Sequence, residues 1–335
     1  MMAALMVSCA ESEFLNEGDF FYLKYKGADM PVWVKGNPNS DVMIITLHGG
    51  PGDAGMSFTI NRGFELLEKD YLMVYWDQRF SGMTQGHYDH SLMTPDQFIE
   101  DTEKIVDLVL QKYPGKSFFL MGHSWGGQLA AGYLGRNNHQ DAFRGWIDLN
   151  GAIYGELESQ LMKEWILDRV PAKLVEPDSD IEFWQWIVDY YEENPAPGNY
   201  SAYEPYFYVS ALRGDAYNWE ETLNVNPIPY NTLVFKSMFT FSYYVYGFGH
   251  QKDMEKWDVL DYTPELGNIT IPSLMLWGAD DGVVPPGVAD YVYENLATAP
   301  TDKKVVKIPE CGHAPFWDQP ERFFEEVSLF VENYK

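Results

Sequence analysis

Continuous apolar runs recur along the chain, and helix-forming segments separate them. Apolar runs without alternating polar residues are typical of strands that are buried on both faces of a sheet. They lie at 42–47, 71–76, 117–121, 145–149, 273–277 and 304–308. Ahead of them, the segments 20–25 and 31–35 are expected to form a hairpin. The pattern predicts a mostly parallel, eight-stranded α/β sheet with helices on both faces.

Two of the expected helices have clear boundaries. Thr94 is a good N-cap, Pro95 suits the first helical position, and Gln97 completes a capping box. We expect this helix to run to about Lys112. The last helix is expected to begin near Pro320, because apolar residues then recur at helical spacing.

One long segment interrupts the alternation of strands and helices. From 155 to 263 the chain shows no clear buried strand and is rich in Trp, Tyr, Glu and Asp. We expect a helical cap over 155–263, inserted into a core made of 19–154 and 264–335. Such an insertion would cover the active site as a lid.

The charge balance excludes some partners. The chain carries 23 basic and 50 acidic residues, a net charge of −27. This excess argues against binding of nucleic acid or of anionic lipid, both of which need Lys and Arg. Solubility is the simple explanation of the charge, and an acidic pocket for cationic substrates is the alternative. The two cysteines do not make a disulfide framework, and no zinc-binding spacing is present.

Residues 1–18 are expected to be an N-terminal tail. The first ten residues, MMAALMVSCA, are too short to span a bilayer and lack the basic start of a signal peptide. The small residues before Cys9 resemble the end of a bacterial lipoprotein signal. That resemblance implies a lipid anchor at Cys9 and a place in the bacterial cell envelope or periplasm. A frayed apolar tail on a cytoplasmic protein is the alternative.

The run GHSWGG at 122–127 follows one apolar strand and precedes a helix-like stretch at 128–134. This is the GxSxG pattern in the strand–turn–helix setting that it requires. The serine sits on a sharp turn, so its neighbours two positions away must lack side chains. The turn exposes the hydroxyl and directs the N-terminus of the following helix at developing negative charge. Ser124 is therefore the candidate nucleophile, and a structural serine in a glycine-rich turn is the alternative.

A second glycine-rich run, HGGPG at 48–52, directly follows the strand 42–47. Glycines in this place indicate close approach of the backbone to another group. In a serine hydrolase that group is the substrate oxyanion, and we expect Gly50 and Trp125 to supply the two main-chain N–H donors. A phosphate loop is excluded because no Gly-Lys-Ser/Thr follows.

His313 is the candidate general base. It lies between the strand 304–308 and the last helix, at the carboxyl edge of the sheet where active sites of open α/β sheets gather. His123 adjoins Ser124, but adjacent residues on a tight turn point apart, so we interpret it as structural. His48 is interpreted as a brace of the glycine-rich loop.

The acid that orients the base should fall between the serine and the histidine in the chain. Asp280 and Asp281 follow the strand 273–277, and both are candidates. Asp281 is preferred, Asp280 is the first alternative, and Asp148 on an earlier strand is a weaker third.

Five motifs occur here in the order found in the α/β-hydrolase superfamily: HGGPG at 48–52, DQRFSG at 77–82, GHSWGG at 122–127, GADD at 278–281 and GH at 312–313. The first two together resemble the proline iminopeptidase branch. The resemblance covers about 30–150 and 265–335. It supports Asp281 as the acid and Gly50 as an oxyanion donor, and it implies that Asp77 and Arg79 are scaffold residues beside the site. The family commonly has glycine where this chain has Phe80.

The resemblance also implies how a substrate would be held. Proline iminopeptidases bind the free amino terminus of the substrate with carboxylates of the cap. The cap of this chain has many acidic residues, and Glu204, Glu220 and Glu221 are among the candidates.

The expected reaction is acyl transfer to water through an acyl-enzyme on Ser124, without a metal or cofactor. The substrate is expected to be a short peptide that loses its N-terminal proline or another small residue. An esterase or lactonase that acts on small apolar acyl groups is the alternative. A binding module without catalysis is a third interpretation, which the complete set of Ser, His and Asp disfavours.

Overall fold

The computed structural model describes residues 18–87, 89–193, 208, 209, 212, 214, 215, 257 and 260–335. Cys9 and the rest of the predicted tail before Gly18 lie outside the described residues, as do Glu204, Glu220 and Glu221. Most of the predicted cap beyond residue 193 lies outside them as well.

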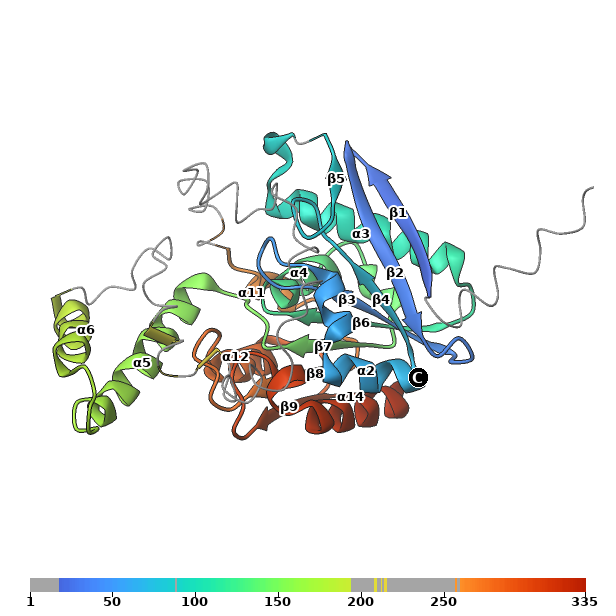
Figure 1. Cartoon of the computed structure of the whole chain (residues 1–335). Coiled ribbons are helices and arrows are strands. Elements are labelled where there is room, and N and C mark those ends of the chain that lie inside the picture. Colours follow the sequence, from blue (N-terminus) through green and yellow to red (C-terminus); the bar gives the residue numbers. More distant parts are fainter. Residues whose placement is uncertain are drawn as a thin grey trace, which may run out of the picture.

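The predicted hairpin and all six predicted buried strands are present in one sheet. The hairpin is β1 (Asp19–Tyr25) and β2 (Ala28–Gly36). The other strands are β3 (Val42–Leu47), β4 (Leu72–Trp76), β6 (Ser117–His123), β7 (Gly145–Leu149), β8 (Ser273–Gly278) and β9 (Lys303–Ile308). Their order is β1-β2-β4-β3-β6-β7-β8-β9, and the pairs from β4 to β9 are parallel (Figure 1).

The predicted number of eight strands is wrong for the described residues, because the sheet has nine. The extra strand is β5 (Gln85–Gly86), which pairs antiparallel with the start of β2. Both of its residues are exposed, so no apolar run marks it in the sequence.

Helices connect the strands, and the two predicted boundaries are confirmed. Helix α3 (Pro95–Lys112) begins after Thr94, whose side chain accepts a hydrogen bond from the main-chain N–H of Gln97. Helix α14 (Pro320–Tyr334) begins at the predicted proline. The other α-helices among the described residues are α2 (Arg62–Asp70), α4 (Trp125–Leu134), α5 (Gly155–Lys173), α6 (Ile181–Glu193), α11 (Thr263–Leu266), α12 (Gly287–Asn295) and α13 (Pro315–Asp318). Short 3₁₀ turns are η1 (Gly55–Ile60), η2 (His90–Leu92) and η3 (His139–Ala142).

Alternate residues of each central strand enter two separate cores. Met43, Ile45 and Leu47 of β3 pack on the face covered by α3, α4, α11 and α12. Val42 and Ile44 of the same strand pack on the other face, against α2, α13 and α14. This double burial explains why the strands read as continuous apolar runs. Helices α5 and α6 extend away from the sheet and form their own small cluster (Figure 1).

The DQR motif directly follows β4 and joins the hairpin to the core. The guanidinium of Arg79 donates two hydrogen bonds of 2.8 Å to the carboxylate of Asp101 on α3. It also donates to the main-chain carbonyls of Tyr25 and Lys26 at 3.2 Å. Arg79 and Asp101 are both buried.

The carboxylate of Asp77, in the same motif, accepts hydrogen bonds from the main-chain N–H groups of Met56 and Met83. Burial of this carboxylate raises its pKa to about 6.

We expect Arg79→Met to lower the free energy of unfolding by about 3 kcal/mol, because it leaves the carboxylate of Asp101 buried without its cation. Urea unfolding would measure this loss. Arg62 is half exposed, and its ion-pair partners among the described residues, Glu65 and Glu321, are exposed as well. Arg62→Met should therefore change stability by less than about 1 kcal/mol. Equal effects of the two substitutions would contradict the importance of the buried pair.

Candidate active site

The turn between β6 and α4 holds Ser124 in a strained conformation, with φ 56° and ψ −124°. The neighbouring glycines are necessary because the backbone is closely packed here. A Cβ at Gly122 would lie 2.2 Å from the carbonyl oxygen of Gly126. A Cβ at Gly126 would lie 2.0 Å from the carbonyl oxygen of Leu47. The strand–turn–helix geometry expected for Ser124 is therefore present.

The glycine-rich loop after β3 lies against this turn. A Cβ at Gly49 would lie 3.2 Å from Cβ of Ser124, which shows how close the two segments are. Gly50 has φ 112°, a conformation that favours glycine. Within the described residues, neither Gly50 nor Trp125 donates its main-chain N–H to another group. Both N–H groups are thus available close to Ser124.

Asp281 and His313 are in direct contact. Nδ1 of His313 lies 2.9 Å from Oδ2 of Asp281. The carboxylate accepts a hydrogen bond from Nδ1–H, which leaves the lone pair of the ring on Nε2. Oδ1 of the buried Asp281 accepts from the main-chain N–H groups of Val283 and Val284, at 2.8 and 3.0 Å. The side-chain amide of Asn150 donates to Oδ2. The carboxylate is therefore held rigidly toward the imidazole.

The two alternative acids are placed differently. The carboxylate of Asp280 is partly exposed and lies 3.5 Å from the guanidinium of Arg169. Asp148 is fully buried, and neither of its carboxylate oxygens has a hydrogen-bond partner among the described residues. Burial, with a further contribution from Glu158, raises the pKa of Asp148 well above its usual value. Of the three aspartates, Asp281 is the one that contacts His313.

His123 connects the turn at Ser124 to the loop of His313. Burial, followed by the nearby His313, lowers the pKa of His123 to about 3, so its ring is neutral. Its Nε2 lies 2.9 Å from the main-chain carbonyl oxygen of His313, and the two ring centroids are 4.9 Å apart. His123 thus has the structural position predicted for it. Among the described residues, no hydrogen bond joins the hydroxyl of Ser124 to His313.

The segment between β7 and β8 also contacts the acid and base loops. The main-chain carbonyl of Gly214 accepts from Gly282 N–H, and that of Asp215 accepts from His313 N–H, each at 3.0 Å. The ring of Trp165 on α5 covers Gly282, where a Cβ would lie 2.9 Å from it. The two hydrogen bonds could not be predicted from the sequence, because a main-chain carbonyl leaves no sequence signal.

Two families match the chain. The family described as "Serine aminopeptidase, S33" matches residues 38–196, and the family described as "alpha/beta hydrolase fold" matches residues 246–320. The chain belongs to the α/β-hydrolase superfamily.

Relatives of this α/β hydrolase place it on the proline iminopeptidase-like branch. The chain is 23% identical to a proline iminopeptidase of Flavobacterium johnsoniae over 322 residues, which cover 93% of this chain and 97% of that one. The solved structure of a proline iminopeptidase-related protein from Thermus thermophilus has the same fold, with a TM-score of 0.66, 21% identity and coverage of 94% and 98%. A shorter match is 39% identical over 70 residues to a pimeloyl-[acyl-carrier protein] methyl ester esterase of Nitrosomonas europaea, covering 21% and 25%. These matches support an enzyme of the α/β-hydrolase type.

Phe80 stands where this branch commonly has glycine, and its backbone has a conformation that favours glycine. Phe80 has φ 58°, in the left-handed region that glycine adopts without strain. Its buried ring stacks on that of His90 at 5.9 Å, so packing compensates for the unfavourable backbone.

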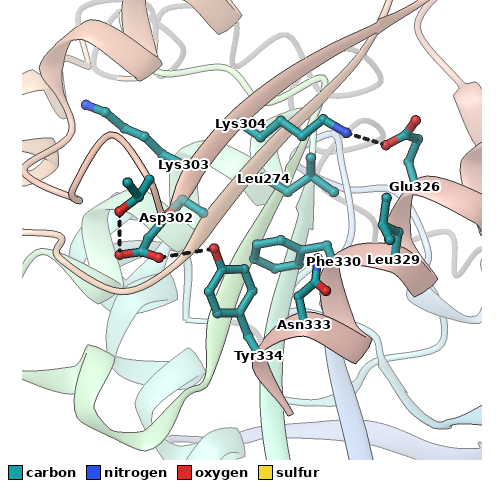
Figure 2. Close-up of a pocket in the computed structure, with 11 residues that line it drawn as sticks. Leu274, Asp302, Lys303, Lys304, Glu326, Leu329, Phe330, Asn333 and Tyr334 are labelled. Atoms are coloured by element: carbon teal, nitrogen blue, oxygen red, sulfur yellow. Dashed lines mark hydrogen bonds and ion pairs between the residues drawn. The ribbon is translucent and has the colours of Figure 1, made fainter.

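A cavity of about 190 Å³ lies between β9 and α14 (Figure 2). It lies at the amino ends of β8 and β9, the sheet edge opposite Ser124 and His313. Two of its charged groups, Lys304 and Glu326, form an ion pair of 2.9 Å. Lys303 donates to the main-chain carbonyls of Tyr293 and Leu296. In the described part of the chain, no cluster of His, Cys, Asp or Glu is arranged for a metal ion, and no helix has the length and hydropathy to cross a bilayer.

Glu158 is a carboxylic acid close to the base, and no motif marks it in the sequence. Its Oε1 accepts from the main-chain N–H groups of Ile153 and Tyr154, at 2.5 and 2.9 Å. Burial raises its pKa to about 7, against the smaller opposing effects of these hydrogen bonds and of His313.

We expect Glu158→Gln to flatten the dependence of stability on pH. The folded wild type holds the proton of Glu158 more tightly than the unfolded chain, so its stability falls as the pH rises from 4.5 to about 7. Relative to the variant, the wild type should lose up to about 3 kcal/mol between pH 5 and pH 8. Urea unfolding at both pH values would measure this. Glu156→Gln, at an exposed position on the same turn, should leave the dependence unchanged. Parallel curves for wild type and Glu158→Gln would contradict the raised pKa.

Proposed function

We propose that this protein is a serine hydrolase with a Ser124–His313–Asp281 triad, and that it acts as a proline iminopeptidase-like aminopeptidase on short peptides. The observation that supports it most is the 2.9 Å contact between His313 and Asp281. His123 connects the loop of His313 to the strained turn that carries Ser124. Strain of this kind persists only where surrounding structure supports it, and it concentrates at functional sites.

In the proposed reaction, the hydroxyl of Ser124 attacks the substrate carbonyl while Nε2 of His313 takes its proton. The carboxylate of Asp281 stabilises the imidazolium without itself accepting the proton. The main-chain N–H groups of Gly50 and Trp125 bind the oxyanion. His313 then protonates the leaving amine, and water releases the acyl group from Ser124. In apo structures the hydrogen bond from nucleophile to base is often long, and it tightens when substrate binds.

Full-length similarity to proline iminopeptidases favours a peptidase. The net charge of −27 suits a substrate with a free ammonium group. We also propose that the segment 155–263 forms a cap over the site, because Trp165, Gly214 and Asp215 contact its acid and base loops.

A carboxylesterase or lactonase is the second candidate function. It is favoured by the local match to a methyl ester esterase, which spans only 70 residues. The same triad would cleave an ester, so the difference depends on the substrate-binding segment.

We expect the wild type to hydrolyse proline p-nitroanilide and Ser124→Ala to lose on the order of 10⁴-fold or more in kcat. Parallel assays with p-nitrophenyl acetate would separate the two candidate functions. Ester turnover without any amide cleavage would contradict the peptidase. Full activity of Ser124→Ala on both substrates would contradict the serine mechanism altogether.

The two adjacent aspartates provide a matched test of the acid. We expect Asp281→Asn to lower kcat about 10⁴-fold, because the imidazole loses the carboxylate that fixes its tautomer. Asp280→Asn should change kcat less than about threefold, because that side chain pairs with Arg169 at the protein surface. Steady-state kinetics would measure both. The reverse ranking would assign the acid to Asp280.

A further inference from the structure

Gln78 is a fully buried amide between two segments that the proposed mechanism uses. It follows β4, whereas the glycine-rich loop follows β3 and Trp125 follows Ser124 at the start of α4. Its Nε2 donates to the main-chain carbonyl of His48 at 2.9 Å. Its Oε1 accepts from Nε1 of Trp125 at 3.0 Å. One side chain therefore bridges the two segments.

The partners determine how this amide is oriented. A main-chain carbonyl can only accept, and an indole N–H can only donate. The amide NH₂ group must therefore face His48 and the amide oxygen must face Trp125. A shorter or apolar side chain at position 78 could not make both bonds.

The backbone of Gln78 also fixes the ring of His48. Its main-chain N–H donates to Nε2 of His48 at 3.0 Å, so the proton of the neutral ring lies on Nδ1. Nδ1 lies 2.8 Å from the main-chain carbonyl oxygen of Gly49 and donates to it. Gln78 thus holds the loop both at His48 and, through the ring, at the residue before Gly50.

Trp125 is held firmly on its other sides. Its buried ring packs edge-on against Phe98 and Trp257, with centroids 5.9 and 5.1 Å away. The bond to Gln78 therefore connects the loop to a rigid ring rather than to a mobile one.

We propose that Gln78 is a positioning residue that sets the separation of the two oxyanion donors, Gly50 N–H and Trp125 N–H; this rests on the proposed function. The donors come from segments more than seventy residues apart in the chain. Such donors stabilise a transition state when they lie about 2.7–3.1 Å from the oxyanion, so a small displacement of one segment reduces catalysis.

The test compares Gln78→Met and Trp125→Phe with a matched control, Gln97→Met. Trp125→Phe removes the indole N–H and keeps the main-chain N–H and an aromatic ring. Gln97 is also a buried amide, but it bonds to Asp101 and Lys26 in the scaffold. The readouts are kcat and KM for the substrate that the wild type turns over, the rate of labelling by a fluorophosphonate, and the melting temperature.

We expect Gln78→Met to lower kcat and the labelling rate about 10- to 100-fold, with KM changed less than about threefold, because only the transition state carries the oxyanion. Trp125→Phe should lower kcat about tenfold. The double variant should be no slower than Gln78→Met alone, because both changes break the same bridge. Gln97→Met should lower the melting temperature and leave kcat within about twofold.

A kcat of Trp125→Phe within about twofold of the wild type would overturn the proposal. This measurement tests the proposal even if Gln78→Met does not fold. A loss in Gln78→Met that appears only as raised KM would overturn it as well. Failure of the proposed function looks different, because the wild type would then neither turn over substrate nor react with the fluorophosphonate.

Discussion

Backbone segments approach one another very closely at Ser124, and the other parts of the site are arranged around this contact. Gly122 and Gly126 leave no room for a Cβ, and the carbonyl of Leu47 lies against Gly126. This contact brings β3, β6 and the start of α4 within backbone distance of one another. It also fixes Ser124 at φ 56°, a conformation that an isolated chain would avoid. The loop with Gly50 and the loop with His313 are then placed around a serine whose backbone these contacts hold in position.

Much of this architecture was predictable because its signals are local. Strands buried on both faces read as uninterrupted apolar runs, and α3 carries its own cap at Thr94. The turn at Ser124 is marked by glycines that steric contact makes necessary. The family pattern supports Asp281 over Asp280, and the structure gives a physical basis for this preference. Main-chain N–H groups of Val283 and Val284 hold one carboxylate oxygen of Asp281 and leave the other facing His313.

Other parts could not be predicted because they depend on distances between remote residues. Asn150 donates to Asp281 across 131 positions, and nothing beside it in the sequence indicates that partner. Gln78 lies inside a recognised motif, yet its bridge from His48 to Trp125 exists only once three strands are aligned. The strand β5 has two exposed residues and no apolar signal. Glu158 acquires its raised pKa from burial, which an acidic segment does not reveal.

The carbonyls of Gly214 and Asp215 have a consequence for how this chain can diverge. They hold Gly282 and His313 through the main chain, so these two bonds do not themselves involve the side chain at position 215. A deletion or added residue near 214 would shift the register of both carbonyls and pull on the acid and base loops together. These two main-chain bonds therefore depend more on the length of the chain near 214 and 215 than on the side chain at position 215.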